Sequence, residues 1–269
     1  MVWLGLWVCG MLTGITSILF GFGGGFVLVP LLAYVLPLLL GDATTGYLHL
    51  AIATATLVMC GNASLASWVQ WRAGKLANIP VRLLVWIALG ATLGAWAGMQ
   101  LSARYLKVAF LVYLAFSWLD AVCRPGFLHR KRELQNEGLF AACWLQLPIG
   151  LAVGSIAAML GVGGSVMTTP WLRRQGYAMQ QATAMANLLS LPVAMAGSMV
   201  YLQMAPAGRA GSSGFIAGAI YWPAAIILMC SAGLGMQVAI RLLPRLPDKW
   251  HAYGYLGLLG VVILAMVFV

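Results

Sequence analysis

Two glycine-rich stretches are the part of this sequence whose residue types and spacing could bind a ligand. The first, GFGGGFVLVP (residues 21–30), has four glycines in five positions of an apolar run, and the second, GVGGSVMTTP (residues 161–170), repeats its glycines and proline. Glycine adopts positive φ readily and lets a ligand approach the backbone. A helix that restarts after such a turn has free N–H groups and a positive dipole end. The two stretches therefore predict a shared anion site.

Six positions in these breaks are expected to form the backbone part of the site, with Gly23, Gly24 and Gly25 at positive φ. They are Gly23, Gly24, Gly25, Gly163, Gly164 and Ser165. Hydroxyls and amides suit an oxyanion, which accepts hydrogen bonds and donates few. The polar side chains expected to line the site are Thr54, Asn62, Gln100, Thr168, Asn187 and Gln237. Two alternatives stay open: hydroxyls that bond to their own helix backbone, and glutamines that join helices or lie at the membrane boundary.

The elements that position these residues must lie in a membrane. Of 269 residues, 62% are hydrophobic and only 7% are charged, which is too little polar surface for a water-soluble globule. Apolar runs of membrane-spanning length recur along the chain without strand alternation, so an all-α polytopic fold is predicted. The net charge of +10 comes from basic residues in short loops, a pattern that marks membrane topology and not nucleic-acid binding.

The chain contains an internal repeat. Residues 14–32 match residues 154–172 at the glycines and the proline, and GMQLSAR (residues 98–104) matches GMQVAIR (residues 235–241) in the same order. Two transmembrane halves, residues 1–122 and 139–269, are expected on either side of a basic cytoplasmic linker, residues 123–138.

The distribution of basic residues predicts how the halves are oriented. If each break returns the chain to the side it came from, each half has five segments and the halves form inverted repeats, as in many secondary transporters. With both termini outside, the outer loops then hold only three basic residues, Arg104, Lys107 and Arg209, and the other twelve are cytoplasmic. A plain kink at each break would divide them almost evenly. The positive-inside rule therefore favours re-entrant helices that meet near the midplane.

Several other kinds of chemistry find no support in the sequence. No Asp or Glu falls at the middle of a predicted span, the five cysteines lack metal-ligand spacing, and neither HExxH nor a plausible GxSxG occurs. We therefore predict no enzymatic activity, no catalytic residue, no metal and no cofactor. The sequence leaves open a homodimer, a coupled proton or other ion, and an accessory subunit of a membrane complex without transport of its own.

Three motifs carry a family resemblance. The glycine-rich break followed by FVLVPLL, then HLAIATATLV and WRAGKLAN, resembles the TauE/SafE family of sulfite exporters and organosulfonate permeases over nearly the whole chain. The resemblance implies a permease of the bacterial inner membrane. Its substrate would be a small anion such as sulfite, thiosulfate, an organosulfonate such as sulfoacetate, or a related organic anion.

Overall fold

A computed structural model describes residues 2–40, 46–76, 79–124, 127, 143–204, 215–242 and 247–268. The described chain is almost entirely helical, and seven of its helices are long and apolar enough to cross a membrane. The predicted all-α polytopic class is confirmed. The predicted linker, residues 123–138, lies outside the described residues except at positions 123, 124 and 127.

The described residues of the first half form five helices. They are α1 (Val2–Phe20), α2 (Gly25–Leu40), α3 (Tyr47–Arg72), α4 (Val81–Gln100) and α5 (Ala103–Cys123). The second half has the same order, with α7 (Cys143–Leu160), α8 (Ser165–Arg174), α9 (Met179–Gln203), α10 (Trp222–Leu242) and α11 (Asp248–Phe268). A short antiparallel hairpin, β1 (Ile216–Ala217) and β2 (Ile220–Tyr221), precedes α10. No strand was predicted here from the sequence.

The chain leaves helical geometry at both glycine-rich stretches. Between α1 and α2, Gly21, Gly23 and Gly24 have positive φ, and between α7 and α8 Gly161 and Gly163 do. The expectation of positive φ at Gly25 is wrong, because this residue is already the first of helix α2. Each turn is therefore complete before the following helix begins.

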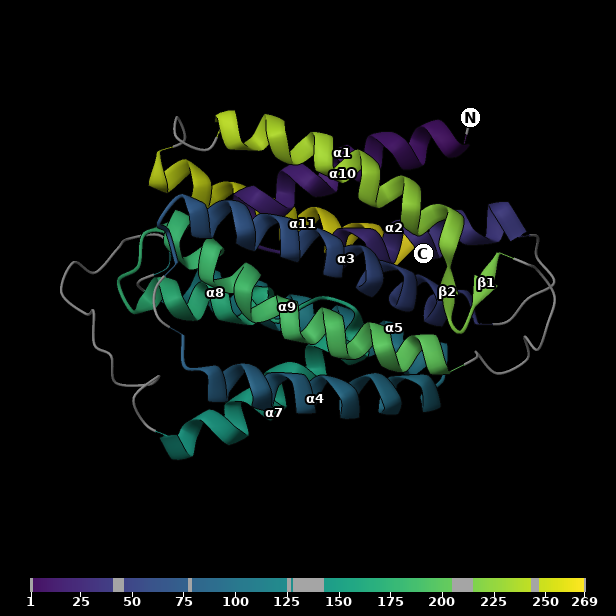
Figure 1. Ribbon diagram of the computed structural model, residues 1–269, viewed down its shortest axis with the longest axis horizontal. Coiled ribbons are helices and arrows are strands. Elements are labelled where there is room, and N and C mark those ends of the chain that lie inside the picture. The colour runs from purple at the N-terminus through teal and green to yellow at the C-terminus, as the bar shows by residue number, and fades with distance from the viewer. Residues whose placement is uncertain are drawn as a thin grey trace.

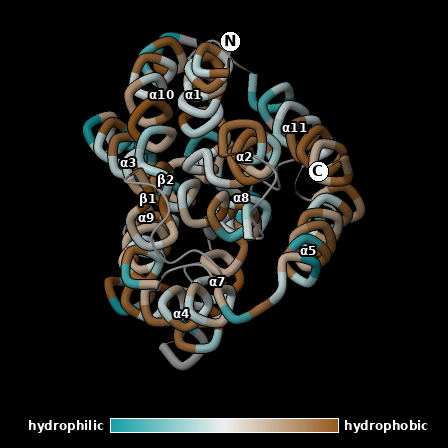
Figure 2. The backbone as a smooth tube through the Cα atoms, turned by 90° about the vertical axis from the view of Figure 1, so that its right-hand side faces the viewer, coloured by the Kyte–Doolittle hydropathy of each residue, from teal (hydrophilic) through white to brown (hydrophobic). Residues whose placement is uncertain are grey.

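The two short helices that follow the breaks occupy the interior. In the end-on view of Figure 2, α2 and α8 lie in the middle of the bundle and the longer helices surround them. In the side view of Figure 1, α2 lies toward the right-hand end and α8 toward the left-hand end. Non-helical backbone in a bilayer requires this kind of protein-lined setting, since its unpaired N–H and C=O groups could not face lipid.

Long helices of the two halves pack closely where glycine replaces a side chain. A Cβ atom on Gly14 of α1 would lie 2.0 Å from the carbonyl oxygen of Ala232 in α10. In the same way, a Cβ atom on Gly94 of α4 would lie 2.0 Å from the carbonyl oxygen of Ser155 in α7. The first helix of each half thus packs on the fourth helix of the other half, with backbones in the close contact that small residues permit.

Polar contacts gather several helix termini at one end of the molecule. Lys75, just after α3, donates to Gln180 at the start of α9 across 3.3 Å. Asp248, the first residue of α11, accepts a hydrogen bond of 2.8 Å from the N–H of Met179. Figure 1 shows this end on the left, with both chain termini toward the right. The structure therefore places the end of α3 and the starts of α9 and α11 together.

Candidate functional site

The two glycine breaks meet in the interior of the bundle. A Cβ atom on Gly25 would lie 2.5 Å from the carbonyl oxygen of Gly161, and one on Gly161 would lie 3.2 Å from Cγ2 of Val29 in α2. The contact therefore joins the beginning of α2 to the turn that precedes α8. No side chain can be accommodated at position 25 unless one of these backbones moves.

Met59 of α3 fills the space between the breaks. Its side chain is fully buried, and it lies against Gly23, Gly25 and Gly163. Cβ atoms at these three positions would come within 2.6, 3.0 and 2.7 Å of the thioether chain, respectively. Methionine is flexible and unbranched, so it can fill an irregular gap and vacate it by changing rotamer. Its role could not be predicted from the sequence, because one methionine among 14 in an apolar chain carries no distinguishing signal.

Buried polar groups accompany the first break. Asn62, one helical turn after Met59, is 2% exposed, and a Cβ atom on Gly24 would lie 3.0 Å from its Nδ2 atom. That Nδ2 atom has no hydrogen-bond partner within the described part of the chain. A buried donor without a partner is costly, so this group is available to a bound solute.

The second break has a hydroxyl at the corresponding place. Ser165, the first residue of α8, is fully buried, and its Oγ atom finds no partner among the described residues. Gly164 just before it is helical, with φ of −69° and ψ of −10°. The second turn is therefore tighter than the first and places a hydroxyl where the first half has Gly25.

A second polar group lies where α1, α3 and α9 approach one another. Asn187 Nδ2 donates to the carbonyl oxygen of Ser17 (3.0 Å) and to Oε1 of Gln70 (3.2 Å). All three side chains are buried. In the described structure Ser17 Oγ, Gln70 Nε2 and Asn187 Oδ1 have no further partner. Gln70 lies near the end of α3 that carries Arg72. This group therefore extends the polar interior from the breaks toward the end of the molecule at which α3 terminates.

The remaining predicted residues lie elsewhere. Thr54 is buried, but its Oγ1 atom accepts a 3.0 Å hydrogen bond from the N–H of Tyr221 in β2. Thr168 lines a cavity beside α8, which is described below. The last two, Gln100 and Gln237, are exposed on α4 and α10.

The exposed glutamines follow from helix geometry. In GMQLSAR and GMQVAIR the glycine is the packing residue: Gly98 contacts Met159, and Gly235 contacts Met11. A residue two positions further along a helix is rotated by about 200°, so a glutamine there points away from the contact. The matching motifs reflect helix packing and do not bring these side chains to the breaks.

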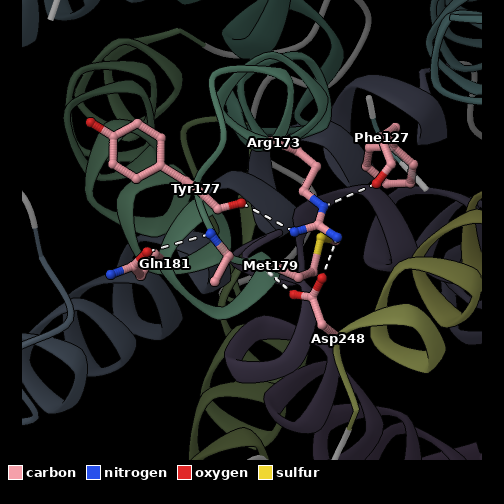
Figure 3. A network of polar contacts seen from close by, with 7 residues as sticks. Phe127, Arg173, Tyr177, Met179, Gln181 and Asp248 are labelled. Atoms are coloured by element: carbon pink, nitrogen blue, oxygen red, sulfur yellow. Dashed lines mark hydrogen bonds and ion pairs between the residues drawn. The ribbon is translucent and has the colours of Figure 1, made fainter. Parts of the chain in front are cut away.

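An ion pair with a buried guanidinium holds α8 next to α11. Arg173 is 1% exposed, and Figure 3 shows its guanidinium turned toward Asp248 and toward two backbone carbonyls. It donates to the carbonyl oxygens of Phe127 (3.0 Å) and Tyr177 (3.2 Å), and its Nη2 atom pairs with Oδ2 of Asp248. All three of these nitrogen donors are occupied, so Arg173 acts as a structural cation.

The described residues contain no group of three or more His, Cys, Asp or Glu side chains that could hold a metal ion. The ligands that the site offers are backbone N–H groups, hydroxyls and amides. These groups bind a solute by hydrogen bonding, and among them is no nucleophile paired with a base.

Membrane-length helices around two broken helices, with buried polar groups where the breaks meet, define a polytopic membrane transporter. The model of the sulfite exporter TauE/SafE family matches residues 6–266. The chain belongs to this family and is a membrane transporter.

Relatives from distant organisms support this assignment. A probable membrane transporter protein of Haemophilus influenzae is 23% identical over 263 residues, covering 96% of this chain and 95% of the relative. One of Methanocaldococcus jannaschii is 22% identical over 243 residues, covering 88% and 86%, respectively. No solved structure matches the chain significantly.

Proposed function

We propose that this transporter moves a small anion across the bacterial inner membrane and binds it where the glycine breaks meet. Candidate substrates are sulfite, thiosulfate, organosulfonates such as sulfoacetate, and related organic anions. The family name supports a sulfur oxyanion. The groups around the breaks support an anion more generally, since Asn62 Nδ2 and Ser165 Oγ can both donate hydrogen bonds.

The contact between Gly25 and Gly161 is the observation that carries this proposal. Because α2 and α8 begin at the two breaks, their first N–H groups lack intrahelical partners, and the contact between Gly25 and Gly161 brings the two breaks together. Both positive dipole ends then act on the same small volume. This is the electrostatic environment that stabilises an anion without a paired cation.

Met59 closes this volume in the conformation described here. We propose that its side chain moves when substrate enters, and that the substrate then contacts Gly23, Gly163 and Asn62. The polar group formed by Ser17, Gln70 and Asn187 would bind the substrate next, on its way to the end of the molecule at which α3 terminates. A solute leaving the breaks would therefore exchange one set of hydrogen bonds for another.

Helix packing favours a particular form of alternating access. We expect α1 to move together with α10, and α4 together with α7, because their backbones are in direct contact at Gly14 and Gly94. Each pair contains one helix from each half, so the halves cannot separate as units. Rocking of the two pairs around α2, α3, α8 and α9 would open the site to each side in turn.

The coupling mechanism and oligomeric state belong to the same proposal. The acidic residues described within helices, Asp120 and Asp248, lie near helix ends and not at midspan. A carboxylate proton relay therefore finds no support within the described helices, which favours uniport over proton-coupled movement. Homodimerisation is compatible with this scheme, and the site does not require it.

Uptake into proteoliposomes tests the proposed function. The purified chain should accelerate entry of at least one anion among sulfite, thiosulfate, sulfoacetate and simple carboxylates, with and without a pH gradient. An accessory subunit would transport none of them, and none would stabilise the purified protein against heating. That pair of negative results would overturn the proposal.

A further inference from the structure

A cavity of about 310 Å³ lies between α4, α5, α7, α8 and α9. Its walls are largely apolar and include Leu83 and Ile87 of α4 and Val153 of α7. Figure 2 shows α5 on one side of this region, α4 and α7 on another, and α8 at the centre. Ligand pockets in proteins span about 300 to 1,000 Å³, so this cavity can hold a ring or a short alkyl chain with a headgroup.

One region of the cavity wall is cationic. Asp120 accepts from Arg174 and forms a 3.1 Å ion pair with Arg124. Two guanidinium groups thus share one carboxylate, which leaves one positive charge in excess among the described residues of the lining. The Nε atom of Arg174 is buried and has no partner within the described chain. An anion near Asp120 would supply the missing acceptor and balance the charge.

Two hydroxyl groups in the lining also lack partners. Thr168 and Ser117 are 7% and 5% exposed, respectively, and neither side-chain oxygen bonds to any other described residue. Hydroxyls in helices usually return a hydrogen bond to their own backbone, as Thr92 does to the carbonyl oxygen of Leu89. That bond is absent here, although both hydroxyls are too buried to be hydrated by bulk water.

Aromatic rings fill the region beside α2. There the rings of Phe20, Phe22, Phe26 and Tyr255 pack together, with centroids 4.0 Å apart for Phe22 and Phe26 and 4.8 Å apart for Phe22 and Tyr255. The same architecture can therefore be closed by aromatic side chains. The cavity beside α8, which helices of both halves line, is left open instead.

We infer that this cavity binds an amphipathic organic anion: Arg174, Thr168 and Ser117 receive the headgroup, and the apolar walls receive the tail. This inference goes beyond the proposed function, since it assigns a second site and requires binding alone. A bare inorganic oxyanion would leave the apolar walls without a ligand, and a neutral hydrocarbon would leave Arg174 Nε without an acceptor. Only a molecule with both parts satisfies the whole lining.

The test uses the full chain in phosphatidylcholine nanodiscs, with empty nanodiscs as the blank. Radiolabelled naphthalene-2-sulfonate should bind saturably, and unlabelled naphthalene-2-methanol and sulfate should each compete at least tenfold more weakly. Thr168→Val should weaken binding about tenfold, the loss expected for one hydrogen bond to a charged group. Thr92→Val, whose hydroxyl lies outside the cavity and is satisfied by its own helix, should bind as the unaltered protein does.

Two results would overturn the inference: equal competition by the alcohol, or unchanged affinity in both Thr168→Val and the cavity-filling variant Leu83→Trp.

Phosphatidylglycerol nanodiscs at high salt, where surface charge is screened, identify the source of the ligand. A fall in apparent affinity there assigns the site to an anionic lipid, and no change assigns it to a water-soluble anion. Gly25→Ala should still bind the probe even where transport is lost, so failure of this site and failure of the proposed transport function are distinguishable.

Discussion

Gly25 of the first break and Gly161 of the second are in direct contact, with room for no more than a hydrogen atom at position 25. These residues are far apart in the sequence: Gly25 is the first residue of α2, and Gly161 lies in the turn that precedes α8. Their contact brings the beginning of α2 against the second turn. The substrate site we propose depends on this single close approach.

Gly25→Ala tests the contact without introducing backbone strain, because residue 25 already has helical geometry. The added methyl group would lie 2.5 Å from the carbonyl oxygen of Gly161, so one break must shift. We expect anion uptake by proteoliposomes to fall at least tenfold while the chain still purifies as a folded protein. Gly5→Ala is the matched control, since a Cβ atom at Gly5 meets nothing within 4 Å. Normal transport by Gly25→Ala would remove the basis for the site.

Met59 gives a second prediction, in which stability and transport change in different directions. Met59→Ala should destabilise the protein by about 2 to 5 kcal/mol, the usual range for emptying a buried site. It should also leave uptake unchanged or faster, because the group between Gly23 and Gly163 is gone. Met59→Ile is β-branched and stiff, so it should slow uptake instead. Thermal unfolding and initial uptake rates measure the two effects, and equal loss of transport in both variants would show that Met59 is only a packing residue.

The breaks and the helical class could be predicted because they depend on local chemistry. Glycine tolerates positive φ and a bilayer demands internally bonded helices, so composition and the two glycine-rich stretches were enough. Met59, Ser17 and Gln70 could not be found in this way. Their importance comes from contacts between helices distant in the sequence, and their residue types are ordinary in a membrane segment.

Gln100 and Gln237 lie on exposed helix faces, because the repeated motif that contains them marks the glycine that packs against a neighbouring helix. The ion pair between Arg173 and Asp248 could not be predicted from the sequence either. The two residues lie in different segments, and only the tertiary structure brings them together. Sequence spacing indicates which face of one helix a residue occupies, but not which helix lies opposite.

The Arg173–Asp248 pair predicts a stability effect that is separate from transport. Asp248→Asn leaves a buried guanidinium without its counter-charge, and removing one partner of a buried pair costs about 3 to 5 kcal/mol. The loss should lie near the lower limit, because the Asp248 side chain is 41% exposed. We expect a lower unfolding temperature, with little change after Lys249→Gln at the exposed neighbouring position.

A double variant distinguishes the ion pair from simple packing. Combining Asp248→Asn with Arg173→Met removes the buried charge together with its partner, so part of the lost stability should return. If the double variant is as unstable as the sum of the two single variants, the pair contributes only through the volume it fills.

Glycine packing between long helices predicts a contrast between two alanine substitutions. Gly94→Ala would bring a methyl group within 2.0 Å of the Ser155 carbonyl oxygen and separate α4 from α7. We expect a loss of about 1 to 3 kcal/mol, typical of overpacking. Gly233→Ala on α10, where nothing lies within 4 Å, should leave the unfolding temperature unchanged or slightly higher. Similar losses in both variants would mean that glycine acts there through helix flexibility and not through close packing.

Membrane topology can be tested with two cysteines placed far apart in the sequence. Ala73 follows α3, and Lys249 is the second residue of α11. The polar contacts of Lys75 and Asp248 with the start of α9 bring these positions to the same end of the molecule. Returning turns at both breaks put Ala73 and Lys249 on one side of the membrane, whereas plain kinks would put them on opposite sides.

In a background without native cysteines, a membrane-impermeant maleimide should leave both Ala73→Cys and Lys249→Cys unlabelled in intact cells. It should label Ser102→Cys, which lies exposed between α4 and α5 at the other end. This result would agree with the positive-inside rule, because most basic residues then face the cytoplasm. Labelling of only one of the two positions, Ala73→Cys or Lys249→Cys, would exclude the re-entrant arrangement.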